Sequence, residues 1–279
     1  MLGRIPLRPH QLTAPVTPTA DTIVLCHMGV ARLEAATWDL AIDGLVERPA
    51  VLTLADLRRL PAHRIKSVHQ CAGSPLKPRE PTRRVANVVW SGVRLADVLG
   101  VCGVRPEARY VWSEGADWGA FAGVDCPAYR KDLPLERALS PDVLLAFELN
   151  GAPLPPEHGF PVRLVVPGYF GTNSVKWLRR LTLAPKRAEG LFVSQLYNDP
   201  VLDAAGHDTG ATVPVWSLHP EAVIVAPAPA TRLAAGTPVE VWGWAWGDRA
   251  IARVDVSTDG GSSWQAARLT ERLACATVS

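Results

Sequence analysis

Short apolar and alternating segments, separated by turn residues, fill the first two thirds of the chain. Their spacing predicts strands at 23–25, 38–44, 64–68, 109–113 and 143–149, and the last runs into Asn150-Gly151, a typical β-hairpin turn. Thr53, with apolar residues three apart behind it, predicts a short helix that ends before Pro61. Residues 90–100 predict a strand, a turn and a helix that stops at Gly100. Because strands and helices do not alternate regularly, the pattern indicates an α+β fold.

The pattern changes after Val215, where alternating strands are predicted at 222–225, 239–246, 252–257 and 263–266. Their pacing is typical of an immunoglobulin-like β-sandwich, although it supplies only about four of the usual seven or so strands. Residues 1–21 are rich in Pro and Thr and predict an extended arm, and residues 200–213 predict a loop. We therefore expect an arm at 1–21, an α+β domain at 22–198, a linker at 199–214 and a truncated immunoglobulin-like domain at 215–279.

Composition and charge exclude several classes of protein. The chain has 29 Lys and Arg against 27 Asp and Glu, so its net charge of +2 gives no field that attracts nucleic acid or an anionic membrane. No apolar run reaches the roughly 18 residues of a membrane span, and the N-terminus lacks the apolar region of a signal peptide. We expect a cytoplasmic protein, or a periplasmic one if the true start lies upstream, with no membrane or nucleic-acid partner. Five cysteines without C-x-x-C spacing indicate neither a disulfide framework, a zinc site nor an attached haem.

Residues 69–73, His-Gln-Cys-Ala-Gly, place Cys71 where a predicted strand ends and a tight loop begins. A thiolate at such a junction can be presented to a cleft. A lone cysteine is more often a small buried hydrophobic residue, so the functional interpretation depends on the rest of the sequence. The basic segment KPREPTRR at 77–84 is interpreted either as a solvated loop or as an anion-attracting rim beside Cys71.

Three further segments carry a family resemblance: EGAD at 114–117, HGFPVRLVVPG at 158–168 and VKWL at 175–178. Together with HQCAG and WGWAW at 242–246, they resemble the sulfite oxidase family of molybdenum–molybdopterin oxidoreductases over about residues 22–268. The resemblance implies a molybdopterin-binding catalytic domain at 22–198, followed by a shortened immunoglobulin-like dimerisation domain and therefore a homodimer. It implies oxygen-atom transfer, first of all oxidation of sulfite or a related small sulfur oxyanion to sulfate. Electrons would pass to a separate acceptor, expected to be a c-type cytochrome.

The resemblance also implies roles for individual residues. Cys71 would ligate molybdenum, since a soft thiolate suits this metal, and Tyr129 would hydrogen-bond beside the substrate. The residues that would contact the pterin and its phosphate are His27, Cys71, Asp117, His158, Arg163, Ser174, Val175 and Lys176. Arg offers a fork of donors to phosphate and Lys a point charge. Ordinary structural alternatives stay open, namely a surface ion pair for Arg163, a helix cap for Asp117, a core position for His27 and an interface position for Tyr129.

The chain departs from the family pattern at the expected anion site. Leu25 and Leu76 replace two arginines that hold sulfite in the family, and the chain ends before a third. Each lost charge-assisted hydrogen bond is worth about 1.5–3 kcal/mol. Arg79, Arg83, Arg84 and Arg130 are the candidates to replace them. Two alternatives follow: the same cofactor acts on an S- or N-oxide, or the chain is a non-catalytic relative.

Overall fold

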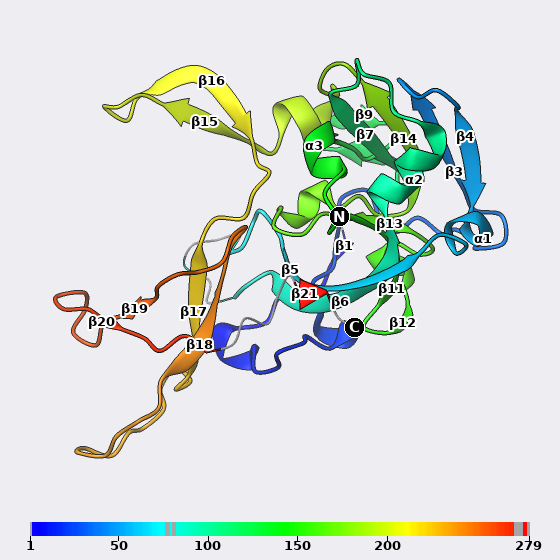
Figure 1. The fold of residues 1–279 in the computed structure, drawn as a ribbon. Helices are drawn as coiled ribbons and strands as arrows, with labels where there is room; N and C mark the ends of the chain where they lie inside the picture. The colour runs from blue at the N-terminus through cyan, green and yellow to red at the C-terminus, as the bar shows by residue number, and fades with distance from the viewer. Residues whose placement is uncertain (1, 76–78, 80–81, 271–275, 278–279) are drawn as a thin grey trace.

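Two β-sheets enclose the main hydrophobic core in the computed structural model, which describes residues 2–75, 79, 82–270 and 276–277 (Figure 1). The five-stranded sheet has the order β10 (Arg130–Pro134), β7 (Tyr110–Gly115), β14 (Leu178–Ala184), β3 (Asp39–Gly44) and β4 (Ala50–Thr53). The six-stranded sheet has the order β12 (Ala152–Pro153), β11 (Leu144–Leu149), β6 (Val85–Arg94), β5 (Ala62–Gln70) and β21 (Ala276–Thr277), with β13 (Arg163–Val165) also on β11. The pairing of β14 with β3 is parallel, while β5, β6 and β11 pair antiparallel.

Short helices and turns join these strands. The α-helices are α1 (Leu54–Leu57), α2 (Leu95–Cys102) and α3 (Leu135–Ala138). The 3-10 helices are η1 (Pro9–Gln11), η2 (Thr19–Asp21), η3 (Pro156–His158) and η4 (Gly171–Asn173), and η5 (Leu191–Gln195) is a π-helix. The main core contains Leu40 and Ile42 of β3 and Val98 and Leu99 of α2, together with other apolar residues of both sheets. This α+β arrangement confirms the predicted fold class.

Local signals placed several elements correctly. Asn150 and Gly151 have φ values of 53° and 82° and join β11 to β12, as the hairpin signal predicted. The Thr53 hydroxyl accepts a hydrogen bond from the Asp56 backbone N–H, and α1 ends well before Pro61. The first predicted strand, at 23–25, is shifted slightly and forms β2 (Leu25–Cys26), which pairs with β1 (Leu2–Gly3).

Two predictions at 90–100 were wrong. No turn occurs at Gly92, because β6 continues through it to Arg94. A Cβ on Gly92 would lie 2.1 Å from the Leu145 carbonyl oxygen, so this glycine allows a close strand–strand approach. Helix α2 also runs through Gly100 and ends at Cys102, where Gly103 (φ 71°) donates its N–H to the Leu99 carbonyl.

The loop predicted at 200–213 is instead a hairpin, formed by β15 (Asn198–Leu202) and β16 (Asp208–Pro214). The hairpin projects from the molecule, and most of its residues are exposed on both faces (Figure 1). Because neither face is buried, the sequence lacks the apolar–polar alternation that marks a half-buried strand. Asp203 closes the turn by accepting the backbone N–H groups of Ala205 and His207.

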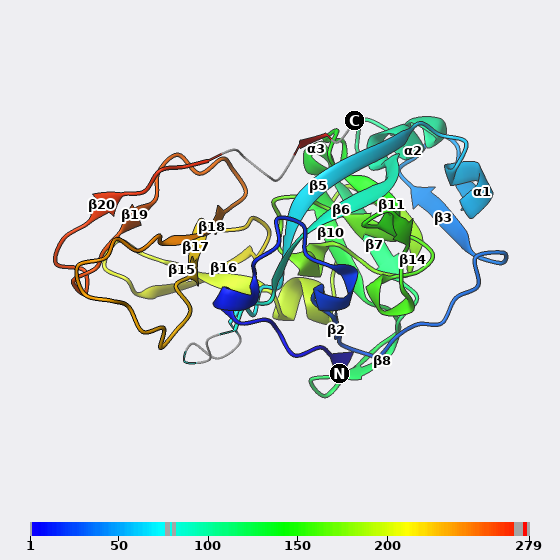
Figure 2. The same cartoon turned by 90° about the horizontal axis from the view of Figure 1, so that it is seen from below.

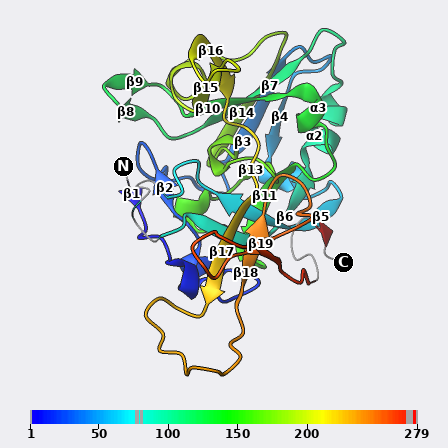
Figure 3. The same cartoon turned by 90° about the vertical axis from the view of Figure 1, so that its left-hand side faces the viewer.

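The C-terminal hairpins form a separate lobe beside the two-sheet body (Figures 2 and 3). β17 (Glu221–Ala226) pairs with β18 (Trp242–Trp246), and β19 (Asp255–Val256) pairs with β20 (Gln265–Ala266), close to the predicted strands. A small core at the junction contains Leu12 of the N-terminal segment, Phe170 and Trp246. A further hairpin, β8 (Gly119–Phe121) with β9 (Val124–Cys126), follows β7. Within the described part of the chain, no helix has the length and apolar content to span a bilayer.

Candidate functional site

Strand β5 carries Cys71 to a loop, as the sequence predicted. Cys71 directly follows the last strand residue, and its backbone N–H donates to the Arg84 carbonyl at 2.9 Å. Arg84 also closes the loop from the other side, because its own N–H donates to Ser74 Oγ at 2.7 Å and its guanidinium donates to the Gly73 carbonyl at 3.1 Å. These contacts fix the backbone that presents the thiol.

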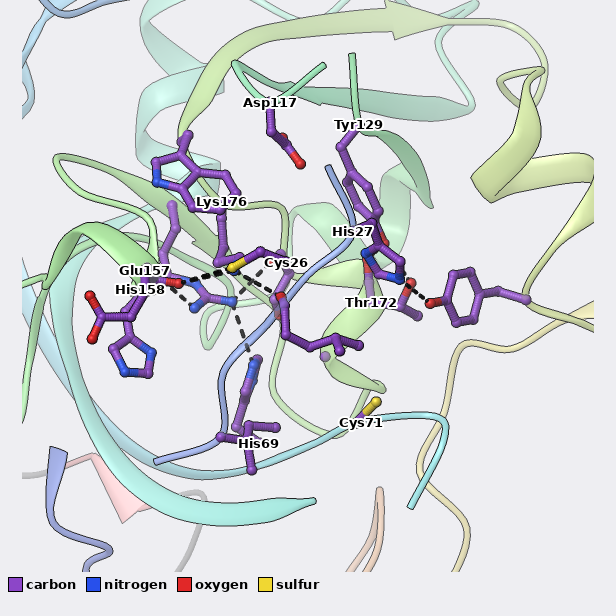
Figure 4. A pocket seen from close by; sticks show the side chains of 17 residues that line it. Cys26, His27, His69, Cys71, Asp117, Tyr129, Glu157, His158, Thr172 and Lys176 are labelled. Atoms are coloured by element: carbon purple, nitrogen blue, oxygen red, sulfur yellow. Dashed lines mark hydrogen bonds between the residues drawn. The ribbon is translucent and has the colours of Figure 1, made fainter. Parts of the chain in front are cut away.

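The Cys71 side chain lines a cavity that opens to solvent. In the view of Figure 4, Cys71 lies on the opposite side of this cavity from Asp117, with Lys176 and Cys26 on one flank and His27 and Tyr129 on the other. The lining residues are Ile23, Leu25, Cys26, His27, His69, Cys71, Asp117, Tyr129, Glu157, His158, Arg163, Gly171, Thr172, Ser174, Lys176, Trp177 and Tyr197. Segments that are distant in sequence therefore meet around one space.

One wall of the cavity is cationic. Arg163 is buried and donates to the carbonyls of His158 and Ser174 at 3.0 and 2.9 Å, with its guanidinium 4.9 Å from the centroid of the Trp90 ring. Lys176 Nζ lies 2.9 Å from the Leu25 carbonyl oxygen, 3.0 Å from that of Glu157 and 2.9 Å from Cys26 Sγ. These three partners occupy all three N–H donors of the lysine. Lys176 therefore offers the cavity its positive charge and no free N–H donor.

Burial leaves these cations poorly compensated. Among the described residues, neither Arg163 nor Lys176 forms a salt bridge with a carboxylate. Burial lowers the pKa of Arg163 to about 9 and also lowers the pKa of Lys176. Two buried positive charges held mainly by carbonyl oxygens make this wall a favourable place for an anionic ligand.

A glycine allows the cationic wall to form. Gly159 has a φ of 105°, a value that L-residues rarely adopt. A Cβ at this position would lie 3.0 Å from the Lys176 Cβ and 3.1 Å from the Arg163 Cβ. The HGFPVR segment thus needs glycine where the backbone passes between the two cationic side chains.

Two histidines on the cavity wall are neutral at pH 7. Burial, with Arg163 nearby, lowers the pKa of His158 to about 3 and also holds the pKa of His69 well below its usual range. His158 is 2% exposed, and its Nε2 has no hydrogen-bond partner among the described residues. A buried ring nitrogen without a protein partner is uncommon, so this imidazole has hydrogen-bonding capacity that the described residues leave unused.

The aromatic flank of the cavity contains a chain of hydroxyl and imidazole contacts. The His27 ring stacks on Tyr129 at a centroid distance of 5.5 Å. Tyr129 donates its hydroxyl to the Thr172 carbonyl at 2.9 Å and lies 2.6 Å from Thr172 Oγ1. The hydroxyl of Tyr197 lies 2.6 Å from His27 Nε2. This flank therefore places two phenols and one imidazole beside the same space.

The protonation of this flank follows from burial. Desolvation lowers the pKa of His27 to about 4 and raises the pKa of Tyr197 to about 12. At neutral pH the Tyr197 hydroxyl is therefore the donor when His27 Nε2 is the unprotonated ring nitrogen. Across the cavity, burial raises the pKa of Asp117 to about 6, so this carboxyl exchanges a proton near neutral pH.

The structure brings most of the residues singled out in the sequence to this cavity. His27, Cys71, Asp117, Tyr129, His158, Arg163, Ser174 and Lys176 all line it. Val175 is the exception among the predicted cofactor contacts, since it is 1% exposed and packs in the main core. Leu25 lies on the cavity wall, while Leu76 is outside the described residues.

The four candidate anion-binding arginines lie off the cavity wall. Arg130 is held by Glu114, with a Nε–Oε1 distance of 2.7 Å, and Arg84 is used in the loop that follows Cys71. Arg83 is half-buried and forms a β-bridge with Leu7, and Arg79 is exposed. None of the four belongs to the lining residues.

Sequence reasoning missed several lining residues, among them Cys26, His69, Thr172 and Tyr197. His69 could have been found from the sequence. Residues two positions apart in a strand point to the same face, and His69 precedes Cys71 by two positions. Nothing in the local sequence marks Thr172 or Tyr197. Tyr197 lies at a sharp turn of the chain, with a φ of 58°, that no turn residue in the local sequence signals.

Comparisons with known proteins agree with this geometry. The family model for the oxidoreductase molybdopterin binding domain matches residues 27–192, and that for the Mo-co oxidoreductase dimerisation domain matches residues 212–275. Sulfite oxidase of Gallus gallus is 34% identical over 274 residues, covering 91% of this chain and 59% of that protein. Nitrate reductase [NAD(P)H] of Hordeum vulgare is 33% identical over 281 residues, covering 90% of this chain and 31% of that protein.

A solved structure gives the same result. The sulfane dehydrogenase SoxCD of Paracoccus pantotrophus superposes with a TM-score of 0.81 at 33% identity, covering 95% of this chain and 67% of that chain. The chain spans about three fifths or less of the length of the curated relatives named above. The family resemblance inferred from the HQCAG and HGFPVR segments is confirmed, and the chain belongs to the sulfite oxidase family of molybdopterin-binding oxidoreductases.

Proposed function

We propose that this chain is a molybdenum-dependent oxidoreductase that binds molybdopterin in the cavity beside Cys71 and catalyses oxygen-atom transfer. The observation that carries the proposal is the meeting of the Cys71 thiol, at the end of β5, with two buried cations, Arg163 and Lys176, around a single cavity. A soft thiolate suits molybdenum, and the cations suit a phosphate.

The donor set of the cavity fits this cofactor. The orphaned His158 Nε2 and the Asp117 carboxyl are unused polar groups that a pterin ring, with its amino and ring nitrogens, can satisfy. In the described part of the chain, Arg163 and Lys176 supply positive charge without a salt bridge to a carboxylate, although Cys26 Sγ lies 2.9 Å from the lysine. Each of these features would be costly in a cavity that stayed without a polar ligand.

When bound, molybdopterin supplies a two-electron redox centre for oxygen-atom transfer, and the protein supplies the surroundings. Cys71 would hold the metal as a thiolate, and its loop is fixed by Arg84. Tyr129 is held by its hydrogen bonds to Thr172, and the Tyr197 hydroxyl oxygen lies 2.6 Å from His27 Nε2. These groups can orient a substrate oxygen and exclude bulk water from that side of the cavity.

The proposed substrate is sulfite or a related small sulfur oxyanion, with electrons leaving to a separate c-type cytochrome. The named activities of the sulfite oxidase relatives support this choice. A second candidate, an uncharged S- or N-oxide, is favoured by Leu25 on the cavity wall and by the position of Arg79, Arg83, Arg84 and Arg130 away from it. We also propose a homodimer through the region that matches the dimerisation domain, residues 212–275.

Metal and pterin analysis of the purified full chain tests the cofactor assignment. Stoichiometric molybdenum is expected in the wild type and in Cys126→Ser, whose cysteine lies outside the cavity. Cys71→Ser should lose the metal. Full metal content in Cys71→Ser would remove the ligand assignment, and wild-type protein without pterin fluorescence after denaturation would support a non-catalytic relative.

Two steady-state assays then separate the substrates. Sulfite oxidation is measured with ferricyanide as acceptor, and sulfoxide or N-oxide reduction with a reduced dye as donor. Sulfite turnover well above that of Cys71→Ser supports the first candidate. Turnover of the oxides alone supports the second and refutes sulfite as the substrate.

A further inference from the structure

A buried lysine outside the cavity lining has no role in the mechanism above. Lys131, on β10, is fully buried, and its exposed fraction is 0%. The adjacent Asp132 is not its hydrogen-bond partner, since that carboxylate accepts from Arg187 at 2.9 and 3.0 Å and from the Ala188 N–H at 3.1 Å. Burial lowers the pKa of Lys131 to about 8, so most of the ammonium stays charged at pH 7. A buried charge of this kind is costly and calls for a reason.

The lysine closes the end of π-helix η5. Its Nζ donates to the Phe192 carbonyl at 2.8 Å, in the short helix whose last carbonyls lack intrahelical partners. Asn198 closes the same helix end, because its Nδ2 donates to the carbonyls of Val193 and Leu196 at 2.9 and 3.0 Å.

The chain that leaves this helix end carries Tyr197 into the cavity. The Lys131 ammonium lies 5.3 Å from the centroid of the Tyr197 ring, within the range of a cation–π contact. Tyr197 has a φ of 58°, a conformation that a bulky residue keeps only when its surroundings enforce it. Its hydroxyl meets His27 Nε2 at 2.6 Å on the cavity wall. Lys131 thus contacts both the helix end and the ring that the helix end delivers.

We infer that Lys131 is a positioning residue for Tyr197: its ammonium pins the Phe192 carbonyl and the phenol ring, and so aims the Tyr197 hydroxyl at His27 inside the cavity. The inference rests on the proposed function only in taking this cavity as the site of reaction. Ser113 Oγ contacts the backbone carbonyl of Lys131, not its ammonium. The long side chain therefore serves the η5 end and Tyr197.

Hydrogen exchange followed by mass spectrometry tests the positioning without any turnover. Lys131→Met keeps the length of the side chain and removes the ammonium. We expect exchange of the amides in 193–198 to speed up about tenfold, the loss expected for one hydrogen bond, while β14 amides stay unchanged. Unchanged exchange in 193–198 would overturn the inference. If Lys131→Met does not fold, Lys131→Leu, which also removes the ammonium and its donors, is judged by the same outcome.

A double-mutant cycle on kcat/KM gives the second readout, with whichever substrate the enzyme turns over. Lys131→Met should lower kcat/KM toward the value of Tyr197→Phe, and in the Tyr197→Phe background it should cause no further loss. If the two substitutions instead lower kcat/KM by independent factors that multiply in the double variant, Lys131 does not act through Tyr197. If no substrate is turned over, the proposed function fails, while the exchange experiment still decides the role of Lys131.

Discussion

Removing one indole N–H should loosen the junction between the C-terminal lobe and the strand that carries Cys71. Trp246 Nε1 donates to Gln70 Oε1 at 2.6 Å, and the Gln70 amide donates to Glu221 Oε1 at 2.5 Å. Gln70 is 1% exposed and Trp246 is 7% exposed, so water does not compete for the bond between these two side chains. Trp246→Phe leaves the Gln70 oxygen buried without its donor.

The magnitude follows from burial. An unsatisfied buried acceptor costs about 1–3 kcal/mol, and the smaller ring adds about 1 kcal/mol for lost packing. The free energy of unfolding should therefore fall by about 2–4 kcal/mol, which corresponds to a lower unfolding midpoint by roughly 4–12 °C. Because Gln70 precedes Cys71, alkylation of Cys71 in cofactor-free protein should also become faster.

Thermal unfolding followed by circular dichroism measures the first effect, and peptide mapping after iodoacetamide treatment measures the second. Trp264→Phe is the matched control, because Trp264 is 62% exposed and its indole donates only to the Gly261 carbonyl nearby in sequence. The control should change stability by less than about 0.5 kcal/mol. A midpoint for Trp246→Phe that matches the control would refute the claim that this bond couples the two lobes.

Two further predictions concern the cavity and its support. In Gly159→Ala the new methyl group would crowd Lys176 and Arg163 at a φ of 105°, so we expect a loss of about 1–3 kcal/mol and lower pterin content, measured by thermal unfolding and pterin fluorescence. Gly123→Ala, at a φ of 79° with open space around it, controls for backbone strain, and an equal loss there would contradict the crowding argument. For Lys131, whose pKa is lowered to about 8, the unfolded chain holds a proton that the folded chain releases between pH 8 and about 10.5. The stability of the wild type relative to Lys131→Met should therefore be flat below pH 8 and rise by about 1.4 kcal/mol per pH unit above it; urea unfolding that shows no such rise would contradict the buried cation.

Sequence signals predicted the structure correctly where that structure depends on the backbone preferences of a few neighbouring residues. The turn at Asn150-Gly151 needs positive φ at both residues, and few residue pairs adopt it. The position of Cys71 at a strand end was likewise visible from the alternation before it. The prediction at 200–213 failed for the same reason in reverse, because a hairpin exposed on both faces has no alternation to detect.

The sequence by itself determined the fold class, the family and the residue types of the cavity, since a thiol, two cations and a carboxyl stand in long, specific segments. Only the tertiary structure decided which of the predicted site residues line the cavity. Val175 packs in the main core, and the four candidate anion-binding arginines do not line the cavity. The tertiary structure also revealed Tyr197 and the Gln70–Trp246 bond, whose partners lie 170 and 176 positions apart. Such contacts depend on how the sheets and lobes pack, so the pattern of apolar and polar residues along the chain does not predict them.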